Sequence, residues 1–202
     1  MAKNPMDLYQ EHFVDKDFER LDLFHLLRER FAIRRAIYPG SFVHITPSFV
    51  ISDTAYVEMD KRAKKFFENS ELKEFVSSRK DYSGEAKIAF YAQDYQKKIA
   101  GEDERYDLLI SQYAGFISKH CKRYLKIGGL LLVNNSHGDA SMASINDSYR
   151  LIAVVLKSGS KHRVSEKNLA EYFVPKKEVD VTEEYLEEIQ KGIGYKKTAS
   201  SY

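Results

Sequence analysis

The sequence predicts an α/β fold: a three-layer sandwich with a mostly parallel sheet and helices on both of its faces. Two observations predict it. Five short apolar runs follow one another along the chain, and segments with the apolar spacing of amphipathic helices separate them. This alternation is typical of parallel sheets, in which both faces are buried. A chain of 202 residues is long enough to bury such a core within one domain.

Composition and charge exclude several other classes of protein. Lys and Arg total 32 against 30 Asp and Glu, and the basic residues are spread along the chain, so we expect no nucleic-acid partner. The single cysteine, Cys121, excludes an intramolecular disulfide and a zinc site built from several cysteines, and it favours a reducing, cytoplasmic location. Charges interrupt the first twenty residues, and no stretch has the length of a membrane span, so we expect neither a signal peptide nor a membrane partner.

The first predicted element is an amphipathic helix in the segment DFERLDLFHLLRERF. Its apolar residues recur with the spacing of one helical face: Phe18, Leu21, Phe24, Leu27 and Phe31. We assign this helix to an N-terminal helical extension, residues 1–32, which should pack on the following α/β domain, residues 33–175. A charged C-terminal helix and tail, residues 176–202, complete the predicted organisation.

Three strands are predicted in the first half of the domain. RRAIYPG is a short apolar run that ends at Pro39 and Gly40. TAYVEMD is the second strand, and Asp60 at its end can cap the helix KRAKKFFEN by accepting hydrogen bonds from the first helical turn. A third strand, AKIAFYAQD, follows the polar helix SELKEFVSSR.

The second half adds two more parallel strands and a hairpin. YDLLIS is followed by the helix YAGFISKHCKRYL, and the turn KIGG leads into the strand LLLVNN. The five strands should be centred near residues 37, 57, 91, 109 and 132. YRLIAVVLKSGSKHRV predicts two further strands around a turn, and the terminal helix TEEYLEEIQKG follows Asp180, which has capping-box spacing to Glu183.

Polar side chains gather after the fifth strand, in VNNSHGDAS. Open parallel sheets place ligands outside the carboxyl ends of their strands, so Asn134, Asn135 and Asp139 are candidate substrate-binding residues, together with Tyr113 after the fourth strand. His137 is a candidate catalytic base, because an imidazole exchanges protons near neutral pH. These residue types also form ordinary turns, and two ligands on one short loop do not specify a metal site.

The order of these motifs resembles the class I S-adenosylmethionine-dependent methyltransferases, over roughly residues 33–156. The segments that carry the resemblance are YVEMDKRAKKFF, IAFYAQDY and YDLLISQYAGFISKHCKRYLKIGGLLLVNN. The resemblance implies a Rossmann-like sheet of seven strands with the last one antiparallel. It also implies S-adenosylmethionine as the cofactor, with Glu58 on the ribose hydroxyls and Asp94 near the adenine amine.

The stretch AIYPGSFVHIT departs from the family's pattern. In the family the first strand ends in an acid and the turn reads Gly-x-Gly-x-Gly, because small residues let the backbone approach the cofactor. Here Tyr38 stands at the acid position, and the glycine positions hold Gly40, Phe42 and His44. We therefore expect a reshaped turn that binds the cofactor weakly or in a shifted pose. The cofactor contacts implied by the resemblance are Tyr38, Gly40, Ser41, Glu58, Asp94 and Ser111.

The sequence thus favours S-adenosylmethionine-dependent methyl transfer to an unidentified small molecule or protein group. The competing interpretation is a non-catalytic methyltransferase-like binding or assembly module, which the loss of two turn glycines supports. A third interpretation keeps the cleft but gives it another adenine nucleotide. The segment SQYA stands where some members carry a signature for methylation of base amino groups, so the substrate class stays open, as does the oligomeric state.

Overall fold

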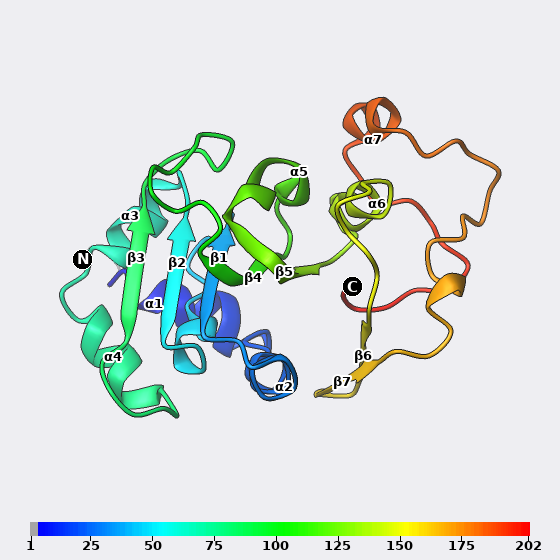
Figure 1. Cartoon of the computed structure of the whole chain (residues 1–202). Helices are drawn as coiled ribbons and strands as arrows, with labels where there is room; N and C mark the ends of the chain where they lie inside the picture. The colour runs from blue at the N-terminus through cyan, green and yellow to red at the C-terminus, as the bar shows by residue number, and fades with distance from the viewer. Residues whose placement is uncertain (1–3) are drawn as a thin grey trace.

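The computed structural model describes residues 4–202, and its centre is a parallel sheet of five strands in the order β3-β2-β1-β4-β5 (Figure 1). The strands are β1 (Arg35–Pro39), β2 (Asp53–Val57), β3 (Lys87–Tyr91), β4 (Tyr106–Ser111) and β5 (Leu125–Val133). Every pairing in this sheet is parallel, as predicted. Two details differ from the prediction. Residues 57 and 91 are the last residues of their strands, and KIGG lies within β5, next to an irregularity of the β4 ladder.

Helices cover both faces of the sheet, which confirms the three layers. One core cluster joins the β1 residues Ala36 and Tyr38 to apolar side chains of α3 (Lys61–Phe67) and α4 (Leu72–Arg79). On the opposite face Ile37 packs with residues of α5 (Ile117–Cys121). The alternation of Ala36, Ile37 and Tyr38 between the two clusters follows from the two-residue period of a strand.

The N-terminal segment packs against the first of these faces. It forms α1 (Asp7–Tyr9), a π-helix over Gln10–Val14, and α2 (Leu21–Phe31). The predicted amphipathic helix is confirmed from Leu21 onward, whereas Phe18 lies before the helix begins. The division of the chain into three parts stays a prediction, and residues 1–3 of the predicted extension lie outside the described residues.

The helix caps test two local predictions. Asp60 caps α3, because its side chain accepts hydrogen bonds from the backbone N–H groups of Arg62 (2.7 Å) and Ala63 (3.4 Å), as predicted. The predicted Asp180 cap is wrong. Thr182 directly precedes α7 (Glu183–Ile189), and its hydroxyl accepts from the N–H of Tyr185 at 3.2 Å.

The expected seven-stranded sheet is wrong. The two further strands, β6 (Val154–Ser158) and β7 (Lys161–Ser165), form the predicted hairpin, but this antiparallel pair is a separate sheet (Figure 1). A groove of about 600 Å³ runs between β5 and β6. The last residues of the chain bridge it: Tyr202 exchanges two backbone hydrogen bonds with Val133 (2.7 and 3.0 Å), and Ser201 accepts one from Val155 (2.8 Å).

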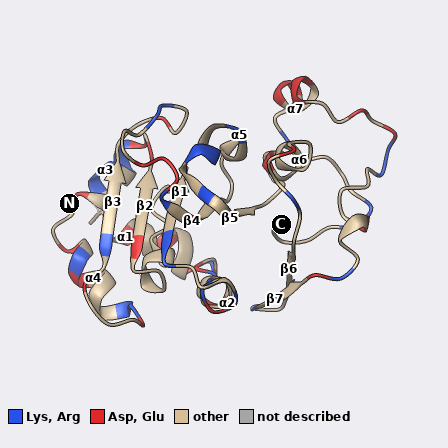
Figure 2. Ribbon diagram, viewed as in Figure 1, with Lys and Arg blue, Asp and Glu red and all other residues tan. Residues whose placement is uncertain are grey.

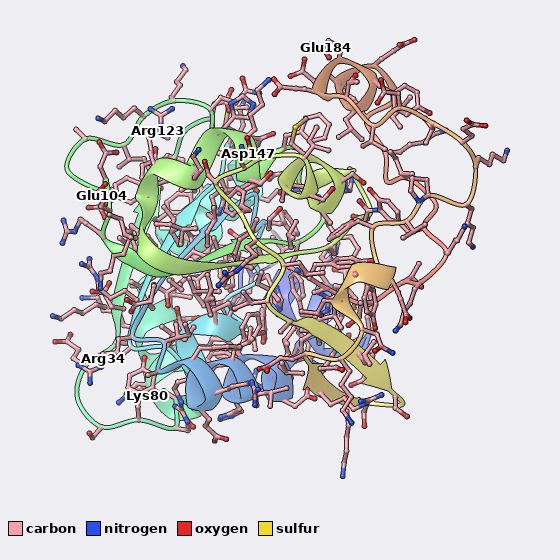
Figure 3. All side chains as sticks on the ribbon, turned by 45° about the vertical axis from the view of Figure 1, so that its right-hand side comes forward. Arg34, Lys80, Glu104, Arg123, Asp147 and Glu184 are labelled. Atoms are coloured by element: carbon pink, nitrogen blue, oxygen red, sulfur yellow. The ribbon has the colours of Figure 1, made fainter. Side chains whose placement is uncertain are left out.

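Charged residues cover the outer surface. Figure 2 shows acidic and basic residues interspersed over the helices and loops, with acidic residues prominent on α7. In Figure 3 the labelled side chains of Arg34, Glu104 and Glu184 extend outward from the ribbon, and all three are exposed.

The remaining α-helix, α6 (Asp139–Ser144), follows β5. Within residues 4–202, every helix is too short or too polar to cross a bilayer.

Candidate ligand-binding site

A cavity of about 370 Å³ lies where β1 and β4 end. These two strands are neighbours in the sheet, and the chain order reverses between them, because β2 and β3 continue on one side and β5 on the other. Open parallel sheets bind ligands at such a crevice. Four predicted site residues line the cavity: Tyr38, Gly40, Ser41 and Tyr113.

The backbone of Gly40 is in close contact with the loop after β4. Gly40 has a φ of +66°, and a Cβ atom built on it would lie 2.4 Å from the Cβ of Ala114. A glycine is therefore needed here, since any side chain would collide with the loop. The close approach at this turn is made by the protein's own chain, and contact of Gly40 with a ligand stays a prediction.

Phe42, at the second glycine position, keeps the left-handed backbone conformation that glycine adopts easily, with a φ of +50°. Its ring contacts the His12 ring (5.1 Å between centroids) and lies 4.8 Å from the guanidinium of Arg62. The phenylalanine ring thus forms part of the cavity wall. The turn has, at this position, a backbone conformation that glycine favours, although phenylalanine occupies it.

His44, at the third glycine position, is a buried side chain whose two ring nitrogens are both engaged. Burial, helped by the charge of Arg20 and only partly offset by a hydrogen bond to Glu19, lowers the pKa of His44 to about 3. The ring is therefore neutral at pH 7. Its Nε2 donates to the carbonyl of Glu19 (3.1 Å), and its Nδ1 accepts from the Tyr38 hydroxyl (3.2 Å). Burial raises the pKa of Tyr38, so this hydroxyl stays protonated.

The two predicted adenosine contacts, Glu58 and Asp94, are not among the residues that line the cavity. Glu58 Oε1 accepts hydrogen bonds from the N–H groups of Met59 (2.8 Å) and Asp60 (3.2 Å). Asp94 Oδ1 accepts from the N–H of Gln96 at 2.9 Å, an ordinary turn contact. Both acids are half-buried at the ends of β2 and β3, where sequence placed them.

Ser111 and Asp139 form a separate, buried cluster. Asp139 accepts from the hydroxyls of Ser111 and Ser118 and from the Ser118 N–H, at 3.1 and 3.2 Å. Burial raises the pKa of Asp139 to about 6, although these hydrogen bonds oppose the shift. With Ser111 and Asp139 each 1% exposed, neither reaches the cavity.

The loop after β5 holds the remaining predicted residues, away from the cavity lining. The side-chain oxygen of Asn135 accepts hydrogen bonds from the backbone N–H and the hydroxyl of Ser141. The side-chain oxygen of Asn134 accepts from the same two groups of Ser136. The side-chain nitrogen of Asn134 is buried and has no hydrogen-bond partner in the described part of the chain. His137 is exposed, and its Nδ1 lies 2.9 Å from the Ser136 hydroxyl. The predicted site is thus divided into a cavity and a polar cluster.

Sequence reasoning missed the residues that the N-terminal segment brings to the cavity: His12, Lys16 and Arg20. Gln112, after β4, was also missed. Arg20 donates to the side-chain oxygen of Gln112 and, at 2.6 Å, to the hydroxyl of Tyr113. The only signal is the segment HFVDKDFER, which mixes aromatic, imidazole and cationic side chains. By itself it is equally typical of an exposed helix.

Among residues 4–202, no group of three or more His, Cys, Asp and Glu side chains is placed to hold a metal ion. No protein-family model matches the sequence, and no curated protein is similar to it.

Solved structures, by contrast, are similar in fold. A methyltransferase from Geobacter sulfurreducens has 11% identity and a TM-score of 0.51, with 81% of this chain and 89% of that chain covered. A candidate O-methyltransferase from Klebsiella pneumoniae has 15% identity and a TM-score of 0.51, with 81% and 88% covered. A candidate S-adenosylmethionine-dependent methyltransferase from Methanococcus maripaludis has 18% identity and a TM-score of 0.46, and the match spans only 60% of its length and 64% of this chain.

The two structures with a TM-score of 0.51 cover most of both chains, so they compare whole domains. At such low sequence identities, the structural similarity shows the fold and does not indicate the substrate. Together with the parallel sheet and its strand order, they show that this chain has the fold of the class I S-adenosylmethionine-dependent methyltransferases.

Proposed function

We propose that this protein binds S-adenosylmethionine at the carboxyl end of its sheet and transfers the methyl group to a small molecule held in the cavity. The observation that carries the proposal is the position of the cavity. It lies at the ends of β1 and β4, where the strand order reverses and where open parallel sheets bind ligands. The methyltransferase fold supports the same assignment.

The residues around the turn fit an adenosyl ligand in two respects. Phe42 preserves the left-handed backbone conformation of the lost glycine, so the turn still borders the cavity. Met59, directly after Glu58, is 64% exposed and presents apolar surface at the end of β2. A flat purine ring can pack on such a surface while a neighbouring carboxylate accepts hydrogen bonds from ribose hydroxyls.

In this proposal Glu58 and Asp94 hold the adenosine end of the cofactor, and Gly40 and Ser41 border its methionine end. When bound, the cofactor supplies an activated methyl group: an electron pair of the acceptor forms a bond to the methyl carbon while the carbon–sulfur bond breaks. The protein's main contribution is alignment, because holding two reactants in line removes much of the barrier. His12, whose imidazole lines the cavity, is placed to take the proton that the acceptor loses.

A second candidate function is a non-catalytic binding or assembly module. Two contacts favour it. Ala114 occupies the space next to Gly40 that a ligand would use, and the Glu58 carboxylate is engaged by three backbone N–H groups. An adenosyl ligand must therefore share Glu58 with the turn. In the third interpretation the same acids, Glu58 and Asp94, hold a different adenine nucleotide. Comparing the binding of AMP with that of the adenosyl ligands distinguishes this interpretation from the other two.

Calorimetric titration with S-adenosylhomocysteine, S-adenosylmethionine and AMP tests these alternatives. We expect the two adenosyl ligands to bind and AMP to bind more weakly. Asp94→Asn keeps the turn acceptor but removes the charge, so it should weaken S-adenosylhomocysteine about 10- to 100-fold, the scale of one hydrogen bond to a charged group. Asp103→Asn, at an exposed acid paired with Lys98, is the matched control. Absence of binding by all three ligands would leave the assembly module as the function, whereas binding of AMP alone would favour the adenine-nucleotide interpretation.

A further inference from the structure

Two cations at the cavity, Lys16 and Arg20, lack a carboxylate partner among residues 4–202. Both acceptors of the Arg20 guanidinium, the Gln112 side chain and the Tyr113 hydroxyl, are neutral. Lys16 is exposed at the cavity, and it makes no hydrogen bond or ion pair within the described part of the chain. The described carboxylates therefore leave the charge of these two cations unneutralised.

The acids nearest to Arg20 in the sequence are engaged elsewhere. Glu19 forms an ion pair with Arg79, the last residue of α4, at 2.8 Å, and it also accepts a hydrogen bond from the Tyr9 hydroxyl. Asp22 pairs with His162 of the β6–β7 hairpin at 2.8 Å. Neither carboxylate neutralises Arg20. The numbers of basic and acidic residues in the sequence are nearly equal. The unpaired charge at the cavity therefore results from where the folded chain places these residues.

The walls of the same cavity are aromatic. Phe13, Phe18, Phe42 and Tyr113 line it, and Phe13 stacks on His44 with 4.3 Å between centroids and an interplanar angle of 4°. The Arg20 guanidinium lies 4.2 Å from the centroid of the Phe18 ring. Flat apolar walls favour a planar molecule, because rings pack on one another face to face or edge to face.

Three of the lining residues hold strained backbone conformations. Arg20, Phe42 and Tyr113 have φ angles of +56°, +50° and +64°, although none of them is glycine. Such conformations are unfavourable for residues with a Cβ atom, and they cluster at sites that clamp ligands. Here one cation and two rings in such conformations line a single cavity.

We infer that this cavity selects a planar, negatively charged methyl acceptor of the aromatic carboxylate class, with Lys16 and Arg20 binding the carboxylate and the aromatic walls packing on the ring. The inference rests on the proposed function for the statement that the bound molecule is the methyl acceptor. The neutral His44 ring takes no part in binding the charge, since both of its nitrogens are engaged.

Three probes of matched size test the inference on the full chain: benzoate, benzamide and cyclohexanecarboxylate. Benzoate is planar and charged, benzamide is planar and neutral, and cyclohexanecarboxylate is charged but not planar. We expect benzoate to bind most tightly, as measured by NMR titration in the presence and absence of S-adenosylhomocysteine. Equal affinity for benzoate and benzamide would overturn the charge selection, and equal affinity for the two acids would overturn the planar selection.

Two variants locate the charge. Arg20→Gln should weaken benzoate at least about 10-fold, the scale of charge-assisted hydrogen bonds. Lys16→Met, at an exposed side chain that leaves the fold intact, should weaken benzoate about 2- to 5-fold, the scale of an exposed ion pair. Lys65→Met, at an exposed lysine of α3 outside the cavity, is the control and should change nothing.

The outcomes separate this inference from the proposed function. If Lys16→Met weakens S-adenosylhomocysteine but not benzoate, the cations bind the cofactor's own carboxylate and the inference is wrong. If benzoate binding depends on Lys16 while S-adenosylhomocysteine does not bind at all, the anion site stands and the methyl-transfer proposal fails. Benzoate affinity that is the same in the parent, Lys16→Met and Arg20→Gln overturns the inference directly.

Discussion

The Glu58 carboxylate accepts a hydrogen bond from the backbone N–H of Phe42 at 2.9 Å, so the end of β2 holds the turn after β1 in place. Two more backbone N–H groups, those of Met59 and Asp60, donate to the other oxygen of the same carboxylate. A side chain that the sequence suggested as a ligand contact therefore also fixes the conformation of the turn. The two roles are separable, because one concerns the folded protein alone and the other its complex.

Replacing Glu58 by Ala should lower the free energy of unfolding by about 1–3 kcal/mol, because three backbone donors lose their acceptor. It should also weaken S-adenosylhomocysteine by about 1–3 kcal/mol, the scale of lost hydrogen bonds to a charged group. Urea denaturation and calorimetry measure the two effects separately. Glu74→Ala, at an exposed helical residue, provides the reference. If stability falls while the affinity is unchanged, Glu58 is structural only.

Phe42→Gly should relieve a left-handed conformation that costs an ordinary residue about 1–2 kcal/mol, at the expense of the ring's contacts with His12 and Arg62. We expect stability to change little and S-adenosylhomocysteine to bind more tightly, because the cavity gains room beside the turn. The single change is cleaner than replacing His44 as well, since His44 is a buried residue with two hydrogen bonds. Weaker binding by Phe42→Gly would show that the ring is a working part of the site.

Gly40→Ala should be strongly destabilising, because the new Cβ would lie 2.4 Å from that of Ala114 at a φ of +66°. Adding Ala114→Gly should restore part of the lost stability by removing the collision, while the backbone cost of about 1–2 kcal/mol persists. A double-mutant cycle by thermal denaturation measures the coupling between the two sites. Simple additivity of the two changes would contradict the contact.

Asp139 should make stability depend on pH in a particular direction. Burial raises its pKa to about 6 from an ordinary 3.8, so the folded protein holds a proton that the unfolded chain has released. The stability from this proton is fully present below 3.8 and is lost as the pH rises through 6. In that window the contribution of Asp139 to the free energy of unfolding should fall by up to about 1.4 kcal/mol per pH unit.

Urea denaturation of the parent and of Asp139→Asn between about pH 4 and pH 7 isolates this contribution. Asp22, Asp60, Asp81 and Asp107 have lowered pKa values and act in the opposite direction, so only the difference between the two proteins is informative. Parallel curves for parent and variant would mean that the Asp139 carboxyl is not titrating in this range.

Elements that depend on neighbours in sequence could be predicted. Asp60 caps a helix that starts at the next residue, and the β6–β7 hairpin closes over a short turn, so the local pattern was sufficient for both. The placement of that hairpin depends on distant contacts, such as the bond between Asp22 and the backbone of His162, and it could not be predicted. The cap at Thr182 was missed because Asp180 has the same chemistry two residues earlier.

The site was predictable at the strand ends and not where the N-terminal segment meets them. Tyr113 follows from the rule that parallel strands end at one edge of the sheet, and Tyr38 and Gly40 were implied by the resemblance to the methyltransferase turn. Arg20 donates a hydrogen bond to Gln112, which lies 92 positions later in the sequence, and the spacing of apolar residues cannot predict such a long-range contact. Ser111 and Asp139 lie beyond the ends of β4 and β5, and the Ser111 hydroxyl donates to the Asp139 carboxylate in the interior, so their contacts with a ligand stay predictions.

Residues 15–20, one wall of the cavity, form only turns and irregular chain between the π-helix and α2. A segment of this kind opens at a smaller free-energy cost than the strands beneath it, so exchange of its amide protons should be faster than exchange in β1 or β4. We expect the time that a molecule stays in the cavity to depend on how often these six residues open. Binding strength and residence time become separately adjustable: the side chains that line the cavity, Lys16 and Arg20 included, set the first, and the stiffness of a short surface segment sets the second.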